Sequence, residues 1–367
     1  MRRSRGRVVQ VESLADFDRR VAAGATRLSG WRVRGVDLSE RGPVLAGLRV
    51  GGATFLGCTF GAGDAESVER AGALVLPALA VAPVDVYRSR LYSPDELYDR
   101  TPYRRSLDGR AYAWSQTPGD ADDSLARTLH DHAIDEALAG WASRRRLAGV
   151  MGGHAAQRGD ADYAEAARLG HLLGAAGVVV ATGGGPGAME AANLGCLLGR
   201  SPAAAVEDVV SGLAAVPAFR PSVDRWLAPA LAVRAGIEDP HDSLAIPTWH
   251  YGHEPSNVFA TAIAKYFRNA TREAILLQVC DAGIAFLPGA GGTVQEVFQD
   301  ACENYYADES SVAAMVLVGR TYWTETLPAW PLLRALARGR TMEGRVHLVD
   351  DVGEAAELLG RQAASGR

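Results

Sequence analysis

A glycine-rich segment with a carboxylate close behind it is the part of this chain best suited to chemistry. Residues 287–296 read LPGAGGTVQE, after the apolar run 283–287 and before apolar residues at helical spacing, Val297, Phe298 and Ala301. The spacing predicts a strand that turns into a helix at the glycines. At such a junction a phosphate can approach the backbone, and the free N–H groups of the helix attract its charge. The segment therefore predicts a phosphate-binding turn with an acid beside it.

The candidate residues divide by role. Gly289, Gly291, Gly292 and Thr293 are the candidates for holding phosphate, and Glu296 is the candidate acid. The same letters also fit a capping box, in which the threonine begins the helix and the glutamate only caps it. That alternative leaves the glutamate without a chemical role.

A second glycine junction lies upstream and favours the ligand interpretation. Residues 182–190 read TGGGPGAME, follow the apolar run 178–180, and open a helix predicted over 188–198. Two such turns in one domain indicate one shared ligand, because ligands of open α/β sheets collect at the carboxyl ends of the strands. The candidates here, with one glycine from the turn after the first strand, are Gly184, Gly185, Gly187, Met189 and Gly153.

Together the two segments resemble the LOG (LONELY GUY) family of nucleoside 5′-monophosphate phosphoribohydrolases, whose signatures are GGGxxGLM-like and PGGxGTxxE. That family also has an arginine shortly before the second motif, and Arg272 stands at the matching place. The resemblance spans roughly residues 147–352 and is greatest to the longer bacterial members, which have an extra N-terminal region. This chain departs from the signatures at Ala290, which replaces the second glycine, and at residues 188–190, which are Ala-Met-Glu in place of Leu-Met-Gly.

The resemblance implies hydrolysis of the N-glycosidic bond of a nucleoside 5′-monophosphate, such as AMP or a cytokinin riboside monophosphate. Its transition state is oxocarbenium-like, so a carboxylate can stabilise the positive charge and activate the attacking water. Glu296 takes that role, and Arg272 is expected to hold it ionised through a charge-assisted hydrogen bond. No cofactor is implied.

The same residues bear on three other functions: a lysine decarboxylase, a dinucleotide-binding protein and a cofactor carrier. LOG proteins are often mislabelled lysine decarboxylases, but pyridoxal phosphate needs a lysine, and the single lysine, Lys265, falls in a pattern that predicts an ordinary helix surface from about Asn257. A dinucleotide site is disfavoured. Its fingerprint needs an acid about 20 residues after the glycines, and although Glu207 and Asp208 lie near that distance, the intervening Arg200-Ser201-Pro202 breaks the pattern. A carrier that holds a nucleotide or molybdenum cofactor on the same fold remains the alternative; the presence of both Arg272 and Glu296 argues against it.

Between the two turns lies a polar and aromatic segment, residues 246–257, expected to form a loop that walls the pocket. Its tryptophan and first tyrosine either stack on a base or pack between domains, and the sequence leaves both open. A zinc site is disfavoured, because its histidines would need a regular helix, and a glycine and a proline interrupt the string; no metal is predicted. The candidates for base or ribose contact are Trp249, His250, Tyr251, His253 and Glu254.

These sites require an α/β fold, a Rossmann-like doubly wound parallel sheet with helices on both faces, plus a smaller mixed N-terminal domain. We predict an N-terminal accessory domain over 1–123, a connecting helix over 124–146 and a catalytic domain over 147–367. A further hypothesis is that the N-terminal domain is a regulatory module that binds an effector or partner. Strands are expected at 148–151, 178–181 and 244–248, a helix at 162–173, and a loop at 102–123. In residues 52–60 apolar side chains recur at every fifth position, over too few steps to indicate a solenoid.

Composition narrows the class of protein. The chain has 367 residues, 48% hydrophobic and 22% charged, with a formal charge of −5, so it has no broad cationic field for nucleic acid. Its four cysteines are widely spaced without a CxxC pair, which favours a reducing compartment. No apolar run approaches the roughly 18 residues of a membrane span. We expect a cytoplasmic protein without a membrane partner and, from the resemblance, a homodimer or larger homo-oligomer.

Overall fold

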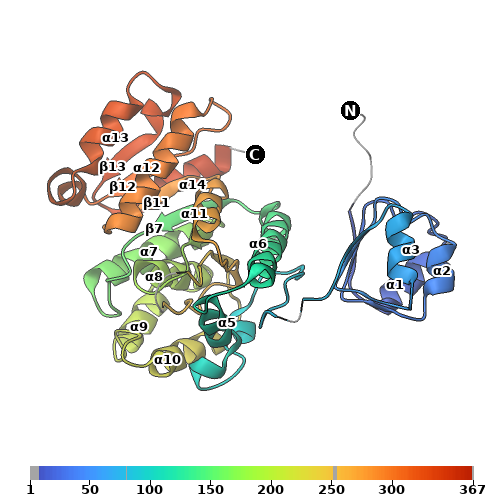
Figure 1. Cartoon of the computed structure of the whole chain (residues 1–367). Helices are drawn as coiled ribbons and strands as arrows, with labels where there is room; N and C mark the ends of the chain where they lie inside the picture. Colours follow the sequence, from blue (N-terminus) through green and yellow to red (C-terminus); the bar gives the residue numbers. More distant parts are fainter. Residues whose placement is uncertain (1–7, 80, 251–253, 366–367) are drawn as a thin grey trace. The chain divides into compact units, whose positions relative to one another are not determined.

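The computed structural model describes residues 8–79, 81–250 and 254–365. The chain forms two compact units (Figure 1): one comprises Met1–Ser89 and Gly119–Ala133, the other Arg90–Pro118 and Ile134–Arg367. Residues 90–118 thus group with the larger unit, whereas the predicted N-terminal domain ran to residue 123. The loop expected at 102–123 is also partly helical, because Ser106 caps a helix there through a hydrogen bond to the amide of Gly109.

The larger unit is built on one sheet of seven strands, and every pair of neighbours is parallel. The order is β10-β9-β8-β7-β11-β12-β13. From β7 the strands are added first toward β10 and then, from β11 on, toward the opposite edge, so the strand order reverses at β7. This confirms the predicted parallel sheet, and the reversal at β7 is where an open α/β sheet forms a crevice. The strands are β7 (Leu147–Met151), β8 (Val179–Thr182), β9 (Ser243–Ala245), β10 (Ala262–Ile263), β11 (Ile284–Phe286), β12 (Met315–Val318) and β13 (Val346–Val349).

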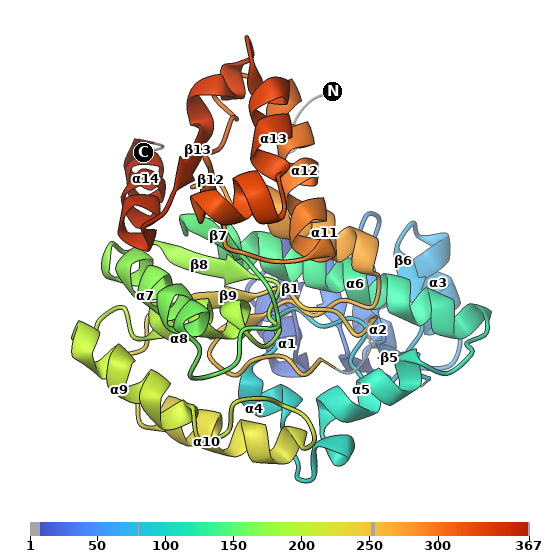
Figure 2. The ribbon, with the colours of Figure 1, turned by 90° about the vertical axis from the view of Figure 1, so that its left-hand side faces the viewer.

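Helices cover both faces of this sheet, as Figure 2 shows. On β7, Val150 belongs to the core shared with the α7 and α8 helices. Gly149, which points to the opposite face, lies against Cys280 at the end of α11. The helices are α4 (Pro94–Leu97), α5 (Leu107–Ser115), α7 (Ala161–Ala175), α8 (Ala188–Leu197), α9 (Ala203–Leu213), α10 (Val223–Ala235), α11 (Asn269–Gln278), α12 (Gly291–Tyr306), α13 (Ala329–Ala337) and α14 (Val352–Ser365), with short turns η1 (Tyr103–Arg105), η2 (Tyr322–Thr326) and η3 (Thr341–Arg345). The α6 helix (Ala121–Ala142) belongs to this unit from Ile134 on, and its earlier residues group with the smaller unit.

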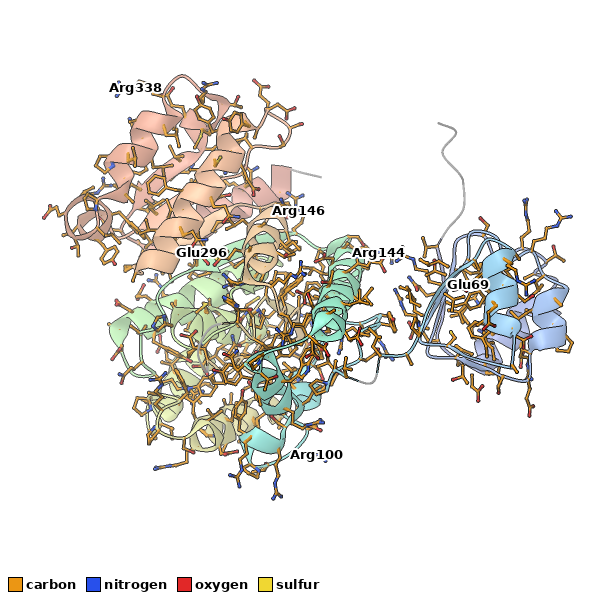
Figure 3. The ribbon with its side chains drawn as sticks, viewed as in Figure 1. Glu69, Arg100, Arg144, Arg146, Glu296 and Arg338 are labelled. Carbon is orange, nitrogen blue, oxygen red and sulfur yellow. The ribbon has the colours of Figure 1, made fainter. Side chains whose placement is uncertain are left out.

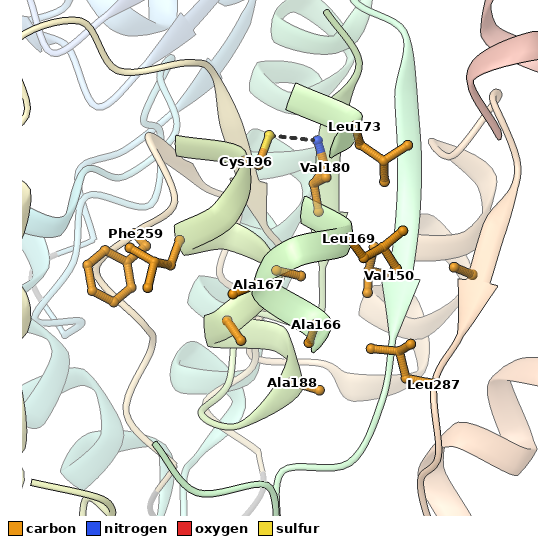
Figure 4. Packing of buried hydrophobic residues seen from close by; sticks show 14 of the residues in the cluster. Val150, Ala166, Ala167, Leu169, Leu173, Val180, Ala188, Cys196, Phe259 and Leu287 are labelled. Atoms are coloured by element: carbon orange, nitrogen blue, oxygen red, sulfur yellow. Dashed lines mark hydrogen bonds between the residues drawn. The ribbon is translucent and has the colours of Figure 1, made fainter. Parts of the chain in front are cut away.

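Close packing of α7 on α8 holds the first glycine turn in place. A side chain at Gly170 would collide with the carbonyl oxygen of Ala192, and one at Gly195 with that of Ala167. The two backbones therefore approach more closely than side chains would allow. Figure 4 shows the apolar layer beneath, where the Cys196 thiol accepts a hydrogen bond from the Val180 amide at 3.4 Å. The second half of α8 is consequently fixed against α7 and the sheet, which holds the turn at its start in place.

The segment before α11 differs from its prediction. A helix from about Asn257 was expected, but the described residues 254–268 contain no helix; instead β10 pairs with β9, and Tyr92 bridges to Ile263 from the other side. Main-chain pairing on both sides outweighs the local helical pattern. The predicted strand at 244–248 is also shorter, because Pro247 has no N–H to continue it.

The smaller unit is a repeat of parallel strands and helices, with a period that the sequence did not predict. Its strands β1 (Val9–Val11), β2 (Trp31–Arg34), β4 (Thr54–Leu56) and β6 (Leu74–Leu76) are joined through α1 (Leu14–Ala22), α2 (Gly42–Ala46) and α3 (Asp64–Arg70), and β3 (Asp37–Leu38) pairs with β5 (Thr59–Phe60). Val9 pairs with Trp31 and Arg32 with Thr54, each 22 residues apart. The repeat is thus a strand and a helix of about 22 residues, as in solenoids, and not a five-residue step.

Candidate functional site

A cleft of about 660 Å³ lies along the carboxyl edge of the seven-stranded sheet. Its walls come from the turns that follow β7, β8, β11 and β12, and from residues after β9 and β13. Three glycine turns that the sequence singled out meet here. The volume is within the range of small-molecule and cofactor sites.

The turn between β11 and α12 presents its backbone to the cleft. The helix begins at Gly291 with Ala290 as its N-cap, so Thr293 is the third helical residue and does not form the capping box. A side chain added at Gly291 or Gly292 would meet nothing within 4 Å, so this backbone is open. The first N–H groups of a helix have no partner within it, and here they border the cleft.

Two side chains brace this turn. Tyr322 donates its hydroxyl hydrogen to the carbonyl oxygen of Gly289 at 2.8 Å. The Thr293 hydroxyl lies where a side chain on Gly289 would be, so that position admits only glycine. Thr293 is nearly buried, at 5% exposure. The turn is therefore a preformed arrangement of backbone donors with one hydroxyl beside them.

The turn between β8 and α8 has glycines for a different reason. Gly184 and Gly187 adopt φ angles of +75° and +77°, which favour glycine. A side chain at Gly187 would come within 2.7 Å of the Gly153 carbonyl oxygen. Both residues are buried, and neither borders the cleft, which is lined instead by Gly183, Gly185 and Met189.

Gly153 ties the two turns together. Its N–H donates to the carbonyl oxygen of Pro288 at 3.1 Å, and its own carbonyl accepts from the amide of Ala188 at 3.2 Å. The neighbouring His154 borders the cleft with a side chain that is 63% exposed. His154 was not among the predicted site residues, although the sequence placed its turn, directly after the first strand, at the carboxyl edge of the sheet.

Glu296 lies in the second turn of α12 and borders the cleft (Figure 3). Burial raises the pKa of its carboxyl to about 7; the positive charge of Arg272 opposes this rise, and the negative charge of Glu273 adds to it. Arg272 therefore favours the ionised form of Glu296, as the sequence predicted, but the desolvation of the buried carboxyl outweighs this attraction. A carboxyl that is partly protonated near neutral pH is suited to proton transfer.

Arg272, on α11, is directed by other neighbours. Its Nη2 donates to the side-chain oxygen of Asn269 at 2.9 Å, and Glu273 lies 3.9 Å away. Its Nη1 is 3.6 Å from the place where a side chain on Gly183 would begin. Arg272 is 9% exposed and borders the cleft. The guanidinium therefore lies against the first glycine turn, where its positive charge also acts on Glu296.

The segment walling the cleft is only partly as predicted. Trp249 is 1% exposed, donates from Nε1 to Asp108 at 2.9 Å and stacks on Phe267 at 4.5 Å, so it packs in the interior and does not reach a base. Thr248 and Glu254 border the cleft, whereas His250 does not. Tyr251 and His253 lie outside the described residues.

Lys265 is a buried anchor, in contrast to the expected helix-surface residue. Its ammonium donates to the Asp108 carboxylate at 2.7 Å and to the Ser256 hydroxyl at 2.9 Å, with 1% exposure. Burial lowers its pKa, and the charge of Asp108 opposes that shift. The prediction failed because Asp108 comes from a segment 157 residues away. This pair joins residues 90–118 to the wall of the cleft.

Within the described residues, no three His, Cys, Asp or Glu side chains are grouped as a metal site would need. Nor does that part of the chain contain a helix whose length and apolar character would suit a membrane crossing.

No family model and no curated protein matches this chain. Among solved structures it is similar to a Moco carrier protein from Chlamydomonas reinhardtii, with 17% sequence identity, a TM-score of 0.37, and coverage of 60% of this chain and 99% of that one. It is also similar to a molybdenum cofactor binding protein from Rippkaea orientalis, with 19% identity, a TM-score of 0.37, and coverage of 59% and 97%. The resemblance to the LOG family continues to rest on the sequence motifs.

Proposed function

We propose that this protein hydrolyses the N-glycosidic bond of a nucleoside 5′-monophosphate, releasing the base and ribose 5-phosphate. The observation that carries the proposal is the placement of Glu296, a carboxyl with a pKa of about 7, in the same cleft as the open backbone of Gly291 and Gly292. Open helical N–H groups suit the 5′-phosphate, and a carboxylate within the cleft suits the adjacent sugar.

The reaction follows from these two parts. With the phosphate on the glycine turn, C1′ of the ribose faces Glu296, whose carboxylate stabilises the positive charge that develops as the C1′–N bond breaks. The base leaves with the bonding electrons and takes a proton from solvent. Glu296 accepts a proton from the attacking water, whose oxygen bonds to C1′. Arg272 lowers the energy of the ionised glutamate and so favours the form that acts.

The second candidate is a carrier that holds a phosphorylated cofactor without cleaving it, the role for which the similar structures are described. The length of the cleft favours it. Beyond the phosphate turn the cleft continues past Gly319 and Tyr322 to Asp350, at the ends of β12 and β13. A ligand longer than a nucleoside monophosphate could occupy that extension.

Replacing the acid separates the two candidates. We expect Glu296→Gln to lower release of ribose 5-phosphate from a panel of nucleoside monophosphates by about 10³-fold, on the scale of removing a group that stabilises transition-state charge. Binding, measured by calorimetry, should change little. Glu303→Gln, on the exposed side of the same helix, is the matched control. Retained turnover in Glu296→Gln would assign the acid elsewhere, and tight binding without cleavage by the wild-type protein would favour the carrier.

A further inference from the structure

The Glu254 carboxylate lines the cleft beside the first glycine turn. One of its oxygens lies 3.5 Å from the place where a side chain on Gly185 would begin. Among the described residues, the basic side chain within 4 Å of this carboxylate is that of His154, whose Nδ1 lies 3.9 Å from one oxygen. That distance is too long for a hydrogen bond. The carboxylate is therefore available to a ligand within the cleft.

The backbone next to Glu254 is anchored. Asn257, which is fully buried, donates from its amide to the Gly184 carbonyl oxygen at 2.9 Å and from Nδ2 to that of Gly185 at 3.3 Å. The hydroxyl of Ser256 accepts from Lys265, and its carbonyl oxygen accepts from the hydroxyl of Tyr98. The hydrogen bonds of Ser256 and Asn257 thus hold the backbone that follows Glu254 against the first glycine turn, so Glu254 belongs to a fixed wall of the cleft.

Neighbouring contacts give the order of groups along the cleft. Arg272 lies beside Gly183, and Glu254 lies beside Gly185. Met189 spans the two, with its sulfur 2.9 Å from the side-chain position of Gly183 and its methyl 2.8 Å from that of Gly185. Two residues of chain extend at most about 7 Å, which is comparable to the long dimension of a purine. A base attached at C1′ would therefore lie along Met189 with its outer edge at Glu254.

The chemistry of a carboxylate selects the edge that it can pair with. An ionised carboxylate only accepts hydrogen bonds, and its two oxygens pair best with two adjacent donors. Guanine offers two, the ring N1–H and the exocyclic amino group. Hypoxanthine offers only the ring N–H, and adenine places its single amino donor beside a ring acceptor. The number of adjacent donors thus ranks these bases.

We propose that Glu254 is the specificity-determining residue of the cleft and that it selects a purine nucleoside 5′-monophosphate with two adjacent donors, GMP over IMP over AMP. The proposal rests on the proposed function for the placement of ribose and phosphate. A well-formed bidentate contact discriminates between bases by about 10- to 100-fold. GMP should exceed AMP by that factor, with IMP between them.

The test is equilibrium binding of GMP, IMP, AMP and ribose 5-phosphate to full-length Glu296→Gln protein, with and without Glu254→Gln. We expect the second change to reduce the GMP-to-AMP affinity ratio to within about 3-fold and to leave ribose 5-phosphate binding unchanged, since it has no base. Glu207→Gln is the matched control, because it removes the same charge from the exposed surface of α9, outside the residues that line the cleft. A ratio that Glu254→Gln does not alter, or a preference for AMP, overturns the proposal.

The same measurements separate this proposal from the hydrolysis that precedes it. If the wild-type protein cleaves no monophosphate but its base preference depends on Glu254, the hydrolysis is wrong and the specificity assignment stands. If cleavage depends on Glu296 while the base preference ignores Glu254, the specificity assignment fails and the hydrolysis stands. Equal loss of affinity for GMP, AMP and ribose 5-phosphate would show a damaged cleft wall and overturn the assignment to base recognition.

Discussion

The two strand–turn–helix segments that form the cleft are alike in sequence and opposite in use. Each has a glycine turn followed by a glutamate in the helix, Glu190 on α8 and Glu296 on α12. Glu190 is 1% exposed and accepts two hydrogen bonds from the guanidinium of Arg158. Glu296 borders the cleft, near Arg272 and without such a pair among the described residues. The same pattern thus produces a structural carboxylate in one segment and a candidate catalytic one in the other.

The glycines follow the same division. In the first turn, Gly184 and Gly187 are required by backbone conformation and by close contacts within the protein. In the second turn, Gly291 and Gly292 face open space, and nothing in the protein excludes a side chain there. The difference teaches that a glycine whose position requires neither a positive φ nor close packing within the protein is a candidate for contact with a ligand. Each of the following changes tests one side of this comparison.

The largest effect on stability is expected from Glu190→Gln. It leaves the Arg158 guanidinium buried without its counter-charge, beside Trp226, whose ring it faces at 4.7 Å. Breaking a buried ion pair in this way costs about 3–5 kcal/mol. Urea unfolding should show this loss, with Glu207→Gln on the exposed surface of α9 as the control. A loss below about 1 kcal/mol would mean that Glu190 is not the structural counterpart described here.

Gly187→Ala should destabilise the protein by about 1–3 kcal/mol, the scale of one strained backbone position. The added methyl group meets the backbone of His154 at 2.8 Å, and φ of +77° is unfavourable for alanine. Thermal unfolding measures the effect. Gly212→Ala, near the end of α9 with open space around it, should instead leave stability unchanged or raise it.

Gly292→Ala should reverse that pattern, with stability unchanged within about 0.5 kcal/mol and the affinity for ribose 5-phosphate reduced by about tenfold. The reason is that a methyl group enters space that the protein leaves open for the phosphate. Calorimetric titration beside thermal unfolding distinguishes the two outcomes. If the variant unfolds more easily and binds as before, the two turns do not differ as proposed.

The smallest effect concerns pH. Turnover needs the ionised form of Glu296, whose pKa is about 7, so kcat should fall about tenfold from pH 8 to pH 6 as the carboxyl takes up its proton. Glu273→Gln removes the negative charge that raises this pKa, and the profile should shift to lower pH. A profile that stays in place, or one that rises toward acid, would falsify the assignment of Glu296 as the acting carboxylate.

Much of the fold was accessible from the sequence, for a physical reason. The apolar runs at 148–151 and 178–181 and the helical spacing over 162–173 predicted β7, β8 and α7 closely, because these elements bury their apolar residues in a regular pattern. The same holds for the helix after residue 124, which is most of α6. The 22-residue repeat was missed because its strands span only two to four residues each. Such short strands carry too few residues to set a period.

For the site, the sequence by itself determined which segments form the cleft: the glycine turns at 183–187 and 289–292, and Glu296 and Arg272 near them, all border or build it. Only the tertiary structure decided the rest. Asp108 reaches Lys265 and Trp249 from a distant segment, which turns a presumed surface lysine and a possible base-stacking tryptophan into interior residues. Burial likewise raises the pKa of Glu296 against the pull of Arg272. Desolvation and long-range pairing depend on which segments meet, and no local pattern encodes that.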